Sequence, residues 1–154
     1  MDLSSVTPLI LTYNEEANIG RTLDRLTWAE RVVVVDSYSD DATVEIADAY
    51  DNVTLVQREF DDHTSQWNHG LDQVDTEWVL SLDADYQVPS EFVEEVRALS
   101  PSDTLAGYRA EFTYCVFGHP LRGTLYPPRI VLFRNDRVRY VQDGHTQRLS
   151  VDGR

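Results

Sequence analysis

The sequence predicts an α/β domain with a mostly parallel central sheet and helices on both faces of that sheet. Strand-like and helix-like apolar periodicity alternates four times over residues 1–99. Strands separated by single helices imply right-handed crossovers and parallel pairing. The segment 31–35 is β-branched on both faces, which is typical of a strand buried on both sides. A length of 154 residues with 42% hydrophobic content favours one domain.

Strands are expected where short apolar runs end at polar or turn residues, and helices where apolar residues recur at helical spacing. Asn14 is expected to cap the first helix, with Glu15 and Glu16 in its first turn. After Gly107 the helical period is lost, so the remainder is expected to be β-rich. The predicted strands are 8–11, 31–35, 53–56, 78–82, 108–116, 130–133 and 138–141, and the predicted helices are 14–26, 39–49, 65–74 and 90–99.

The charge of the chain excludes several classes of function. A formal net charge of −14 disfavours a nucleic-acid partner, which requires a basic surface. All 13 basic residues are Arg, so the chain has neither a phosphate-binding Walker lysine nor a Schiff-base lysine. Abundant Asp with Arg in place of Lys suggests adaptation to a high-salt cytoplasm, where salt screens the repulsion of an acidic surface.

Cysteine content and hydropathy indicate the compartment. The single cysteine, Cys115, allows no internal disulfide and fits a reducing compartment, so the cytoplasm is the expected localisation. No apolar stretch approaches the roughly 20 residues that a transmembrane helix needs. The N-terminus has no basic segment typical of a signal peptide.

Acidic or polar clusters follow three of the predicted strands, at 12–15, 36–41 and 83–85. In a parallel sheet these clusters lie at one edge, where ligands bind. Carboxylates gathered there repel one another unless a cation neutralises them. Oxygen ligands favour Mg²⁺ or Mn²⁺, and Mg²⁺ commonly completes its shell with substrate phosphates and water. The sequence therefore predicts a metal-bound diphosphate beside Asp83 and Asp85.

Three segments resemble family 2 glycosyltransferases, which share the A-type nucleotide-sugar-binding fold. They are PLILTYNEEANIGRTLDRL, VVVVDSYSDDAT and WVLSLDADYQVPSEF, the last being similar to the acid-x-acid metal motif of the family. The segment FGHPLRGTLYPPRIVLFRNDRVRYVQDGHTQRLSVDG is similar to the lipopolysaccharide-core β-glucosyltransferase-like subgroup. The resemblance implies a three-layer α/β/α nucleotide-diphospho-sugar transferase fold over residues 1–154, with a nucleotide-binding half (1–99) and an acceptor-side half (100–154).

The resemblance also implies the residues of the site. Asp83 and Asp85 are the expected metal ligands, with Asp85 the principal one. The ring of Tyr13 is expected near the base, and Asp36 is expected to contact the base or the ribose. The expected nucleotide-sugar-binding residues are Thr12, Tyr13, Asn14, Glu15, Asp36, Ser37, Gln66, Asn68, Asp83 and Ala84. Ser37 stands where many members have a second acid, and Trp67 stands where they have Arg or Lys.

The implied reaction is inverting transfer of a sugar, plausibly glucose, from a nucleotide-diphosphate donor, with UDP favoured. The acceptor is expected to be a saccharide or lipid-linked molecule of envelope or polysaccharide synthesis, which also allows peripheral attachment at the inner membrane face. The His-Glu pair of the subgroup corresponds here to His145-Thr146. The general base is therefore Asp143 or His145.

Two other functions stay open. A non-catalytic nucleotide-sugar-binding module is favoured by the missing glutamate and by relatives that continue beyond the position of Arg154. A nucleotidyltransferase is disfavoured because such enzymes need a Gly-rich, basic loop after the first strand. The acceptor and the oligomeric state do not follow from the sequence.

Overall fold

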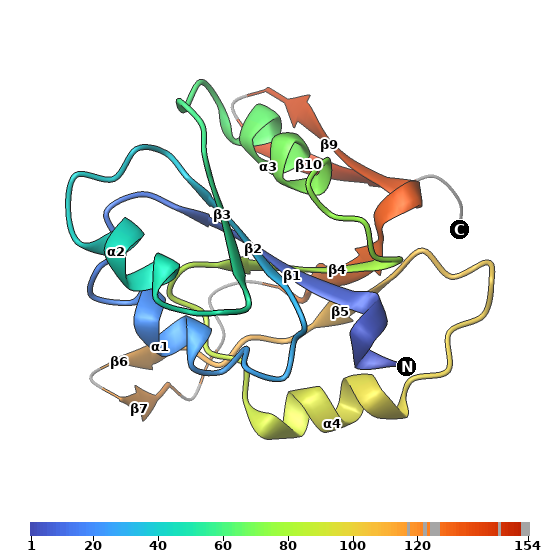
Figure 1. Ribbon diagram of the computed structural model, residues 1–154. Helices are drawn as coiled ribbons and strands as arrows, with labels where there is room; N and C mark the ends of the chain where they lie inside the picture. The colour runs from blue at the N-terminus through green and yellow to red at the C-terminus, as the bar shows by residue number, and fades with distance from the viewer. Residues whose placement is uncertain (117, 122, 124–126, 145, 152–154) are drawn as a thin grey trace.

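The computed structural model describes residues 1–116, 118–121, 123, 127–144 and 146–151, and it confirms the expected α/β class (Figure 1). Its core is a six-stranded sheet with the order β3-β2-β1-β4-β8-β5. The strands are β1 (Val6–Thr12), β2 (Val32–Asp36), β3 (Val53–Gln57), β4 (Trp78–Asp83), β5 (Gly107–Ala110) and β8 (Arg129–Arg134). The first four strands are parallel, whereas β8 runs antiparallel to β4 and β5 antiparallel to β8.

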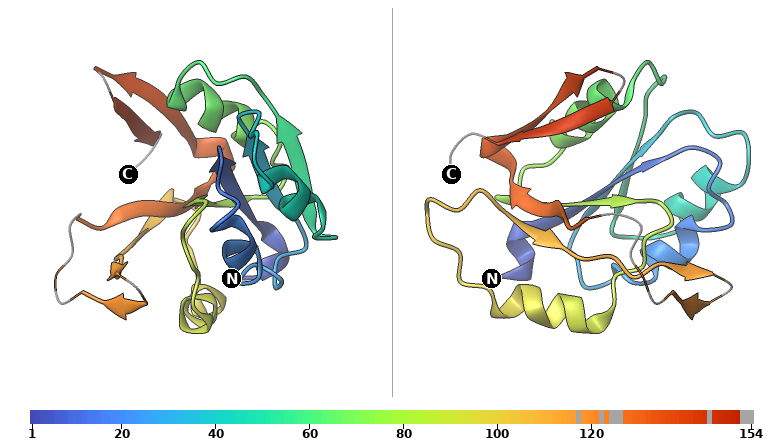
Figure 2. Two further views of the ribbon diagram at one scale, coloured as in Figure 1. Left: turned by 90° about the vertical axis from the view of Figure 1, so that its left-hand side faces the viewer. Right: turned by 180° about the vertical axis from the view of Figure 1, so that it is seen from behind.

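Helices and a hairpin cover the two faces of the sheet. The helices are α1 (Ile19–Leu23), α2 (Thr43–Asp48), α3 (His63–Leu71) and α4 (Ser90–Ala98), with short 3₁₀ turns at Leu3–Ser5 and Asn135–Arg137. Helices α1, α2 and α4 lie on one face, and α3 lies on the other beside the antiparallel hairpin of β9 (Val138–Asp143) and β10 (Thr146–Val151) (Figures 1 and 2). A small hairpin, β6 (Cys115–Val116) and β7 (His119–Pro120), projects from the α1 side.

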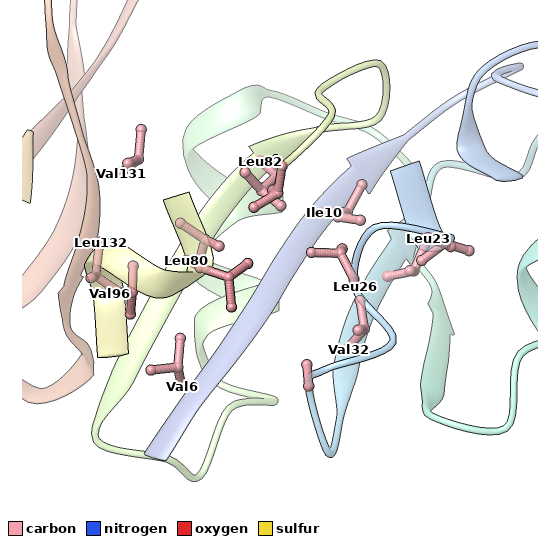
Figure 3. Close-up of a cluster of buried hydrophobic side chains, with 14 of the residues drawn as sticks. Val6, Ile10, Leu23, Leu26, Val32, Leu80, Leu82, Val96, Val131 and Leu132 are labelled. Atoms are coloured by element: carbon pink, nitrogen blue, oxygen red, sulfur yellow. The ribbon is translucent and has the colours of Figure 1, made fainter. Parts of the chain in front are cut away.

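The valines of β2 explain why the sheet is buried on both sides. Val32 and Val34 pack toward α1 and α4, whereas Val33 and Val35 pack toward α3, because side chains alternate along a strand. Figure 3 shows part of the buried cluster on the face covered by α1, α2 and α4, to which Leu80 of β4 and Val96 of α4 both belong. A β-branched run with no polar residue therefore fits only a central strand.

The first two helices begin later than predicted, so the predicted starts at Asn14 and Ser39 are wrong. Asn14 has φ of 53°, a left-handed conformation that an N-cap residue does not adopt. Helix α1 begins at Ile19 and α2 at Thr43. The residues between strand and helix form hydrogen bonds with each other across the two loops instead of entering a helix.

The second half also differs from the prediction. The strand predicted over 108–116 is divided, because β5 ends at Ala110 and only Cys115 and Val116 form β6. Strand β5 is the last in the sheet order and its pairing with β8 shifts register after Tyr108, so it has few partners to extend it. Strand β10 was not predicted, since it forms by pairing along β9 rather than by burial of an apolar run.

Candidate functional site

A cavity of about 790 Å³ lies where the carboxyl ends of β1, β2 and β4 meet α3 and β10. This is the edge at which parallel α/β sheets bind ligands, and the volume suits a ligand of nucleotide size. Its lining residues are Leu11, Thr12, Tyr13, Glu15, Ser37, Glu59, Phe60, His63, Gln66, Trp67, Asp83, Ala84, Asp85 and Gln147.

Most of the predicted site residues come together in this cavity. Those that line it are Thr12, Tyr13, Glu15, Ser37, Gln66, Asp83, Ala84 and Asp85. Residues separated by up to 73 positions meet here because β1 lies between β2 and β4 in the sheet. Asn14, Asp36, Asn68 and Asp143 do not line the cavity, and His145 lies outside the described residues.

The loops after β1 and β2 are joined by hydrogen bonds between side chains and backbone. The Asn14 side-chain oxygen accepts from the Asp40 amide (3.0 Å), and Ser39 Oγ accepts from the Asn14 amide (2.9 Å). Asp41 accepts from the Glu16 amide (3.1 Å). These contacts hold the loops that contain Thr12 and Ser37 against one another. Asn14 therefore contributes to the site by positioning these two loops.

Asp36 is fully buried, at 0% exposure, beneath the loop that follows β2. Its carboxylate accepts hydrogen bonds from the Ser39 amide (2.9 Å), the Ser39 hydroxyl (2.5 Å) and the Gln57 amide nitrogen (3.1 Å). These donors satisfy a charge that would otherwise be costly to bury. Within this structure Asp36 shapes the loop that presents Ser37.

Helix α3 contributes Gln66 to the cavity but turns Asn68 away from it. The Asn68 side chain donates to the Tyr140 carbonyl and accepts from the Tyr140 amide, both at 2.9 Å. It therefore pairs with the backbone of β9 as a neighbouring strand would. The neighbouring Trp67 is 6% exposed and stacks on the Tyr140 ring, with 5.2 Å between the ring centroids.

Asp83 and Asp85 are exposed and line the cavity at the end of β4. Burial, the negative charge of Asp83 and a hydrogen bond with Asp83 raise the pKa of Tyr86, so this phenol stays protonated beside the carboxylates. In the described part of the chain, no group of three or more His, Cys, Asp or Glu side chains could hold a metal ion.

The donor set nevertheless fits a metal ion that is bound together with its substrate. Two carboxylates suffice for Mg²⁺ when phosphates and water complete the shell. Thr12 Oγ1, in the same cavity, is buried and has no hydrogen-bond partner among the described residues. A buried hydroxyl without a partner is uncommon in proteins, and a ligand in the cavity would satisfy it.

Of the two candidate bases, Asp143 does not line the cavity, and His145 lies outside the described residues. Asp143 ends β9, where its carboxylate lies 3.4 Å from Arg148, an ion pair between exposed side chains. From the same hairpin, Gln147 of β10 does reach the cavity. The hairpin therefore borders the site, although its predicted acid points elsewhere.

Sequence reasoning did not assign Leu11, Glu59, Phe60, His63 or Gln147 to the site, although all five line the cavity. Phe60 is 47% exposed and its ring packs edge-on against His63 at 5.0 Å. An aromatic residue inside a polar loop was the available sequence signal. The five residues come from β1, the loop between β3 and α3, α3 itself and β10, so only the tertiary arrangement of these elements brings them to one cavity.

The family model described as glycosyl transferase family 2 matches residues 8–117, more than half of the chain. The chain belongs to glycosyl transferase family 2. The matched segment contains most of β1, all of β2 to β4 and every described residue of the cavity except Gln147.

Two curated relatives support this assignment to the glycosyltransferases. The lipopolysaccharide core biosynthesis glycosyltransferase LpsC of Rhizobium meliloti is 25% identical over 138 residues, which cover 85% of this chain and 51% of that protein. An uncharacterized glycosyltransferase of Rickettsia typhi is 28% identical over 109 residues, which cover 70% of this chain and 37% of that protein. The chain thus spans about half, or less, of these relatives.

Solved glycosyltransferases share the fold. Residues 1–349 of S. aureus TarS in complex with UDP give a TM-score of 0.54 at 30% identity, covering 60% of this chain and 31% of that one. The mannosyltransferase PcManGT from Pyrobaculum calidifontis, in complex with GDP-Man and Mn²⁺, gives a TM-score of 0.57 at 29% identity. The match covers 67% of this chain and 34% of that one. No helix in the described part of this family 2 chain is both long and apolar enough to cross a bilayer.

Proposed function

We propose that this family 2 domain is a metal-dependent inverting glycosyltransferase that uses a nucleotide-diphosphate sugar. The observation that carries the proposal is the cavity in which Asp83 and Asp85 meet Thr12, Tyr13 and Ser37. At one end, the two carboxylates would hold a metal ion that binds the diphosphate. At the other, the Tyr13 ring and the hydroxyls of Thr12 and Ser37 would bind the nucleoside.

The nucleoside end has the chemistry that a base and ribose require. Tyr13 is 58% exposed at the rim, and its ring can pack against a base. The buried Thr12 hydroxyl has no hydrogen-bond partner in the described part of the chain, which favours a hydrogen bond with the ligand. UDP is the proposed nucleotide, since TarS was solved with UDP.

At the other end, Asp83 and Asp85 would hold Mg²⁺ or Mn²⁺, and the ion would stabilise the negative charge of the departing diphosphate. The protonated Tyr86 phenol hydrogen-bonds with Asp83 and would keep its carboxylate in a fixed orientation. The choice of Mn²⁺ is supported by PcManGT, which was solved with GDP-Man and Mn²⁺.

The acceptor hydroxyl would attack the anomeric carbon in one displacement, which inverts its configuration, while a base removes the hydroxyl proton. Asp143 and His145 remain the proposed bases. The ion pair of Asp143 with Arg148 would have to open for Asp143 to act. Replacing Asp143 with Asn should lower kcat without weakening UDP binding, whereas an unchanged kcat would leave His145 as the base.

Glucose is the proposed sugar, and a saccharide or lipid-linked molecule the proposed acceptor. The printed role of LpsC in lipopolysaccharide core biosynthesis supports an envelope or polysaccharide acceptor. Work on such acceptors fits a cytoplasmic protein that binds peripherally at the inner membrane face. The excess of acidic residues supports the proposal that the protein is adapted to a cytoplasm of high salt concentration.

Calorimetric titration with UDP, with Mn²⁺ and then with EDTA, tests the proposal. We expect UDP to bind only with the metal, and Asp85→Asn to weaken binding at least tenfold, because one of two carboxylate ligands is lost. Asp48→Asn, an exposed substitution in α2, is the matched control and should change nothing. Metal-independent UDP binding that Asp85→Asn leaves intact would contradict the proposal.

A non-catalytic sugar-nucleotide module is the second candidate, because Asp143 does not line the cavity and Thr146 stands where the subgroup has a glutamate. Incubation with UDP-glucose and Mn²⁺ separates the two. Release of UDP, by transfer or by slow hydrolysis, supports the enzyme. Tight UDP binding without any release supports the module.

A further inference from the structure

We infer that the Ser37 hydroxyl, oriented by Gln66, selects nucleotides whose base presents a carbonyl oxygen to it over those that present an amino group. Uracil and guanine belong to the first class, and cytosine and adenine to the second. The inference rests on the proposed nucleotide site and specifies which nucleotides that site accepts.

The Gln66 side chain can adopt only one of its two amide orientations. It is 1% exposed, and its oxygen Oε1 accepts from Arg58 Nη1 at 2.6 Å. Its nitrogen Nε2 donates to the Arg58 carbonyl at 3.2 Å. A guanidinium only donates and a carbonyl only accepts, so flipping the amide would break both contacts.

Arg58, which fixes this orientation, is itself held in place. Its guanidinium makes two hydrogen bonds to the Asp61 carboxylate, at 2.8 and 2.9 Å, and its amide donates to the Asp36 carbonyl at 3.0 Å. Two parallel bonds between a guanidinium and a carboxylate restrict the side chain more than one does. The orientation of Gln66 therefore follows from a rigid neighbour.

The fixed amide determines what Ser37 offers to the cavity. Gln66 Nε2 donates to Ser37 Oγ at 3.0 Å, which occupies one lone pair of the hydroxyl. In the described part of the chain, Ser37 Oγ has no other hydrogen bond, so no protein acceptor takes its proton. The half-buried Ser37 lines the cavity, so an acceptor on a ligand bound there would satisfy its proton. A ligand amino group would leave that proton without a partner.

The position of Ser37 matches a base rather than a phosphate. Ser37 follows β2 and Asp83 ends β4, with β1 between them, which separates the two residues by roughly 10 Å along the sheet edge. If the diphosphate is held near Asp83, the attached nucleoside extends along the sheet edge toward Ser37. Glu15 and Glu59 line the same cavity and disfavour a phosphate at any position close to them.

The test compares UDP with CDP, and GDP with ADP, by calorimetry on the intact chain with Mn²⁺. We expect the carbonyl base to bind about tenfold more tightly within each pair, which is the effect of one hydrogen bond. Ser37→Ala should remove most of this preference by weakening UDP and GDP, whereas Ser37→Thr, which keeps the hydroxyl, should retain it.

Gln66→Glu provides a sharper test with almost no change of shape. A carboxylate at position 66 still accepts from Arg58, but it cannot donate to Ser37 and instead accepts the Ser37 proton. Ser37 would then present a lone pair, and the preference should shift toward CDP and ADP. A cooperative thermal unfolding transition shows that each variant is folded. If Gln66→Glu does not fold, the comparison of Ser37→Ala with Ser37→Thr tests the inference.

The outcomes separate this inference from the function on which it rests. If none of the four nucleotides binds the wild-type chain, both proposals are overturned. If all four bind equally, or if Ser37→Ala weakens all four to the same extent, nucleotide binding stands and the selection by Ser37 is overturned. A preference that Ser37→Ala removes and Ser37→Thr keeps supports it.

Discussion

Asn14 and Tyr38 both have left-handed backbones, with φ of 53° and 58°, and each lies in a loop that borders the cavity. Asparagine tolerates this conformation better than most residues, because its short side chain forms local hydrogen bonds. At position 14 the bond is to the Asp40 amide at 3.0 Å, on the neighbouring loop. A single residue thus sets both the direction of one loop and its attachment to the other.

Substitutions at Asn14 should separate these two contributions. Asn14→Ala loses the hydrogen bond and keeps a side chain in a left-handed conformation, so we expect a loss of about 1–2 kcal/mol in the free energy of unfolding. Asn14→Gly loses only the hydrogen bond and should cost less. Urea denaturation measures both, and an equal loss in the two variants would contradict the role of the backbone conformation.

Tyr140 makes the free energy of unfolding depend on pH in the alkaline range. Burial, opposed by a hydrogen bond with Ser81 and reinforced by the charge of Asp83, raises the pKa of Tyr140 to about 12. The unfolded phenol titrates near pH 10, so the folded state binds the proton more tightly. This contribution to stability is complete below pH 10 and is lost as the pH rises through 12.

Tyr140→Phe keeps the ring that stacks on Trp67 and removes the titrating group. We expect the unfolding free energy of this variant to fall less between pH 9 and pH 12 than that of the wild type, by no more than about 2 kcal/mol. Part of the decline should remain, because burial also raises the pKa of Tyr50, Tyr86 and Tyr108. Superimposable pH profiles would show that Tyr140 does not contribute.

At the scale of elements, close contact between α3 and the sheet depends on Gly70. A Cβ at this position would lie 2.7 Å from a methyl group of Leu9 on β1 and 3.2 Å from one of Val35 on β2. Leu9 and Val35 are both fully buried, so neither can move aside freely. The absence of a side chain at position 70 brings Gln66, one turn earlier, to the cavity.

Gly70→Ala should therefore lower the free energy of unfolding by about 1–2 kcal/mol, even though alanine favours helix by about 1 kcal/mol. Gly20→Ala in α1 is the matched control. The nearest atom to its Cβ is an Ile46 methyl group at 3.5 Å, an ordinary contact, so this variant should be neutral or more stable. Equal effects of the two substitutions would contradict the packing explanation.

At the scale of the whole molecule, the dominant property is the net charge of −14 on 154 residues. Like charges repel in the compact state, and salt screens this repulsion. We expect the thermal midpoint to rise between low salt and molar KCl, as differential scanning fluorimetry would measure. A midpoint that does not change with KCl would contradict the proposed adaptation to a high-salt cytoplasm.

Most of the sheet was predictable, because short, mostly apolar runs that end at an aspartate, as in β2 and β4, are typical of buried strands. The starts of α1 and α2 were not, since residues such as Asn14 suit a left-handed turn as well as a cap. The same limit applies to the site: the sequence identified Asp36 and Asn68, but it did not indicate that the Asp36 carboxylate is engaged by Ser39 or that Asn68 pairs with β9.

The sequence by itself determined the class of fold, the family and the edge of the sheet at which the cavity lies, because these follow from local periodicity and from residues directly after each strand. Only the tertiary structure decided which polar groups face the cavity. Ser37, Gln66 and Gln147 reach it from separate elements, whereas nearby Asp36 and Asn68 do not. Side-chain direction depends on partners far along the chain, and no local pattern encodes those partners.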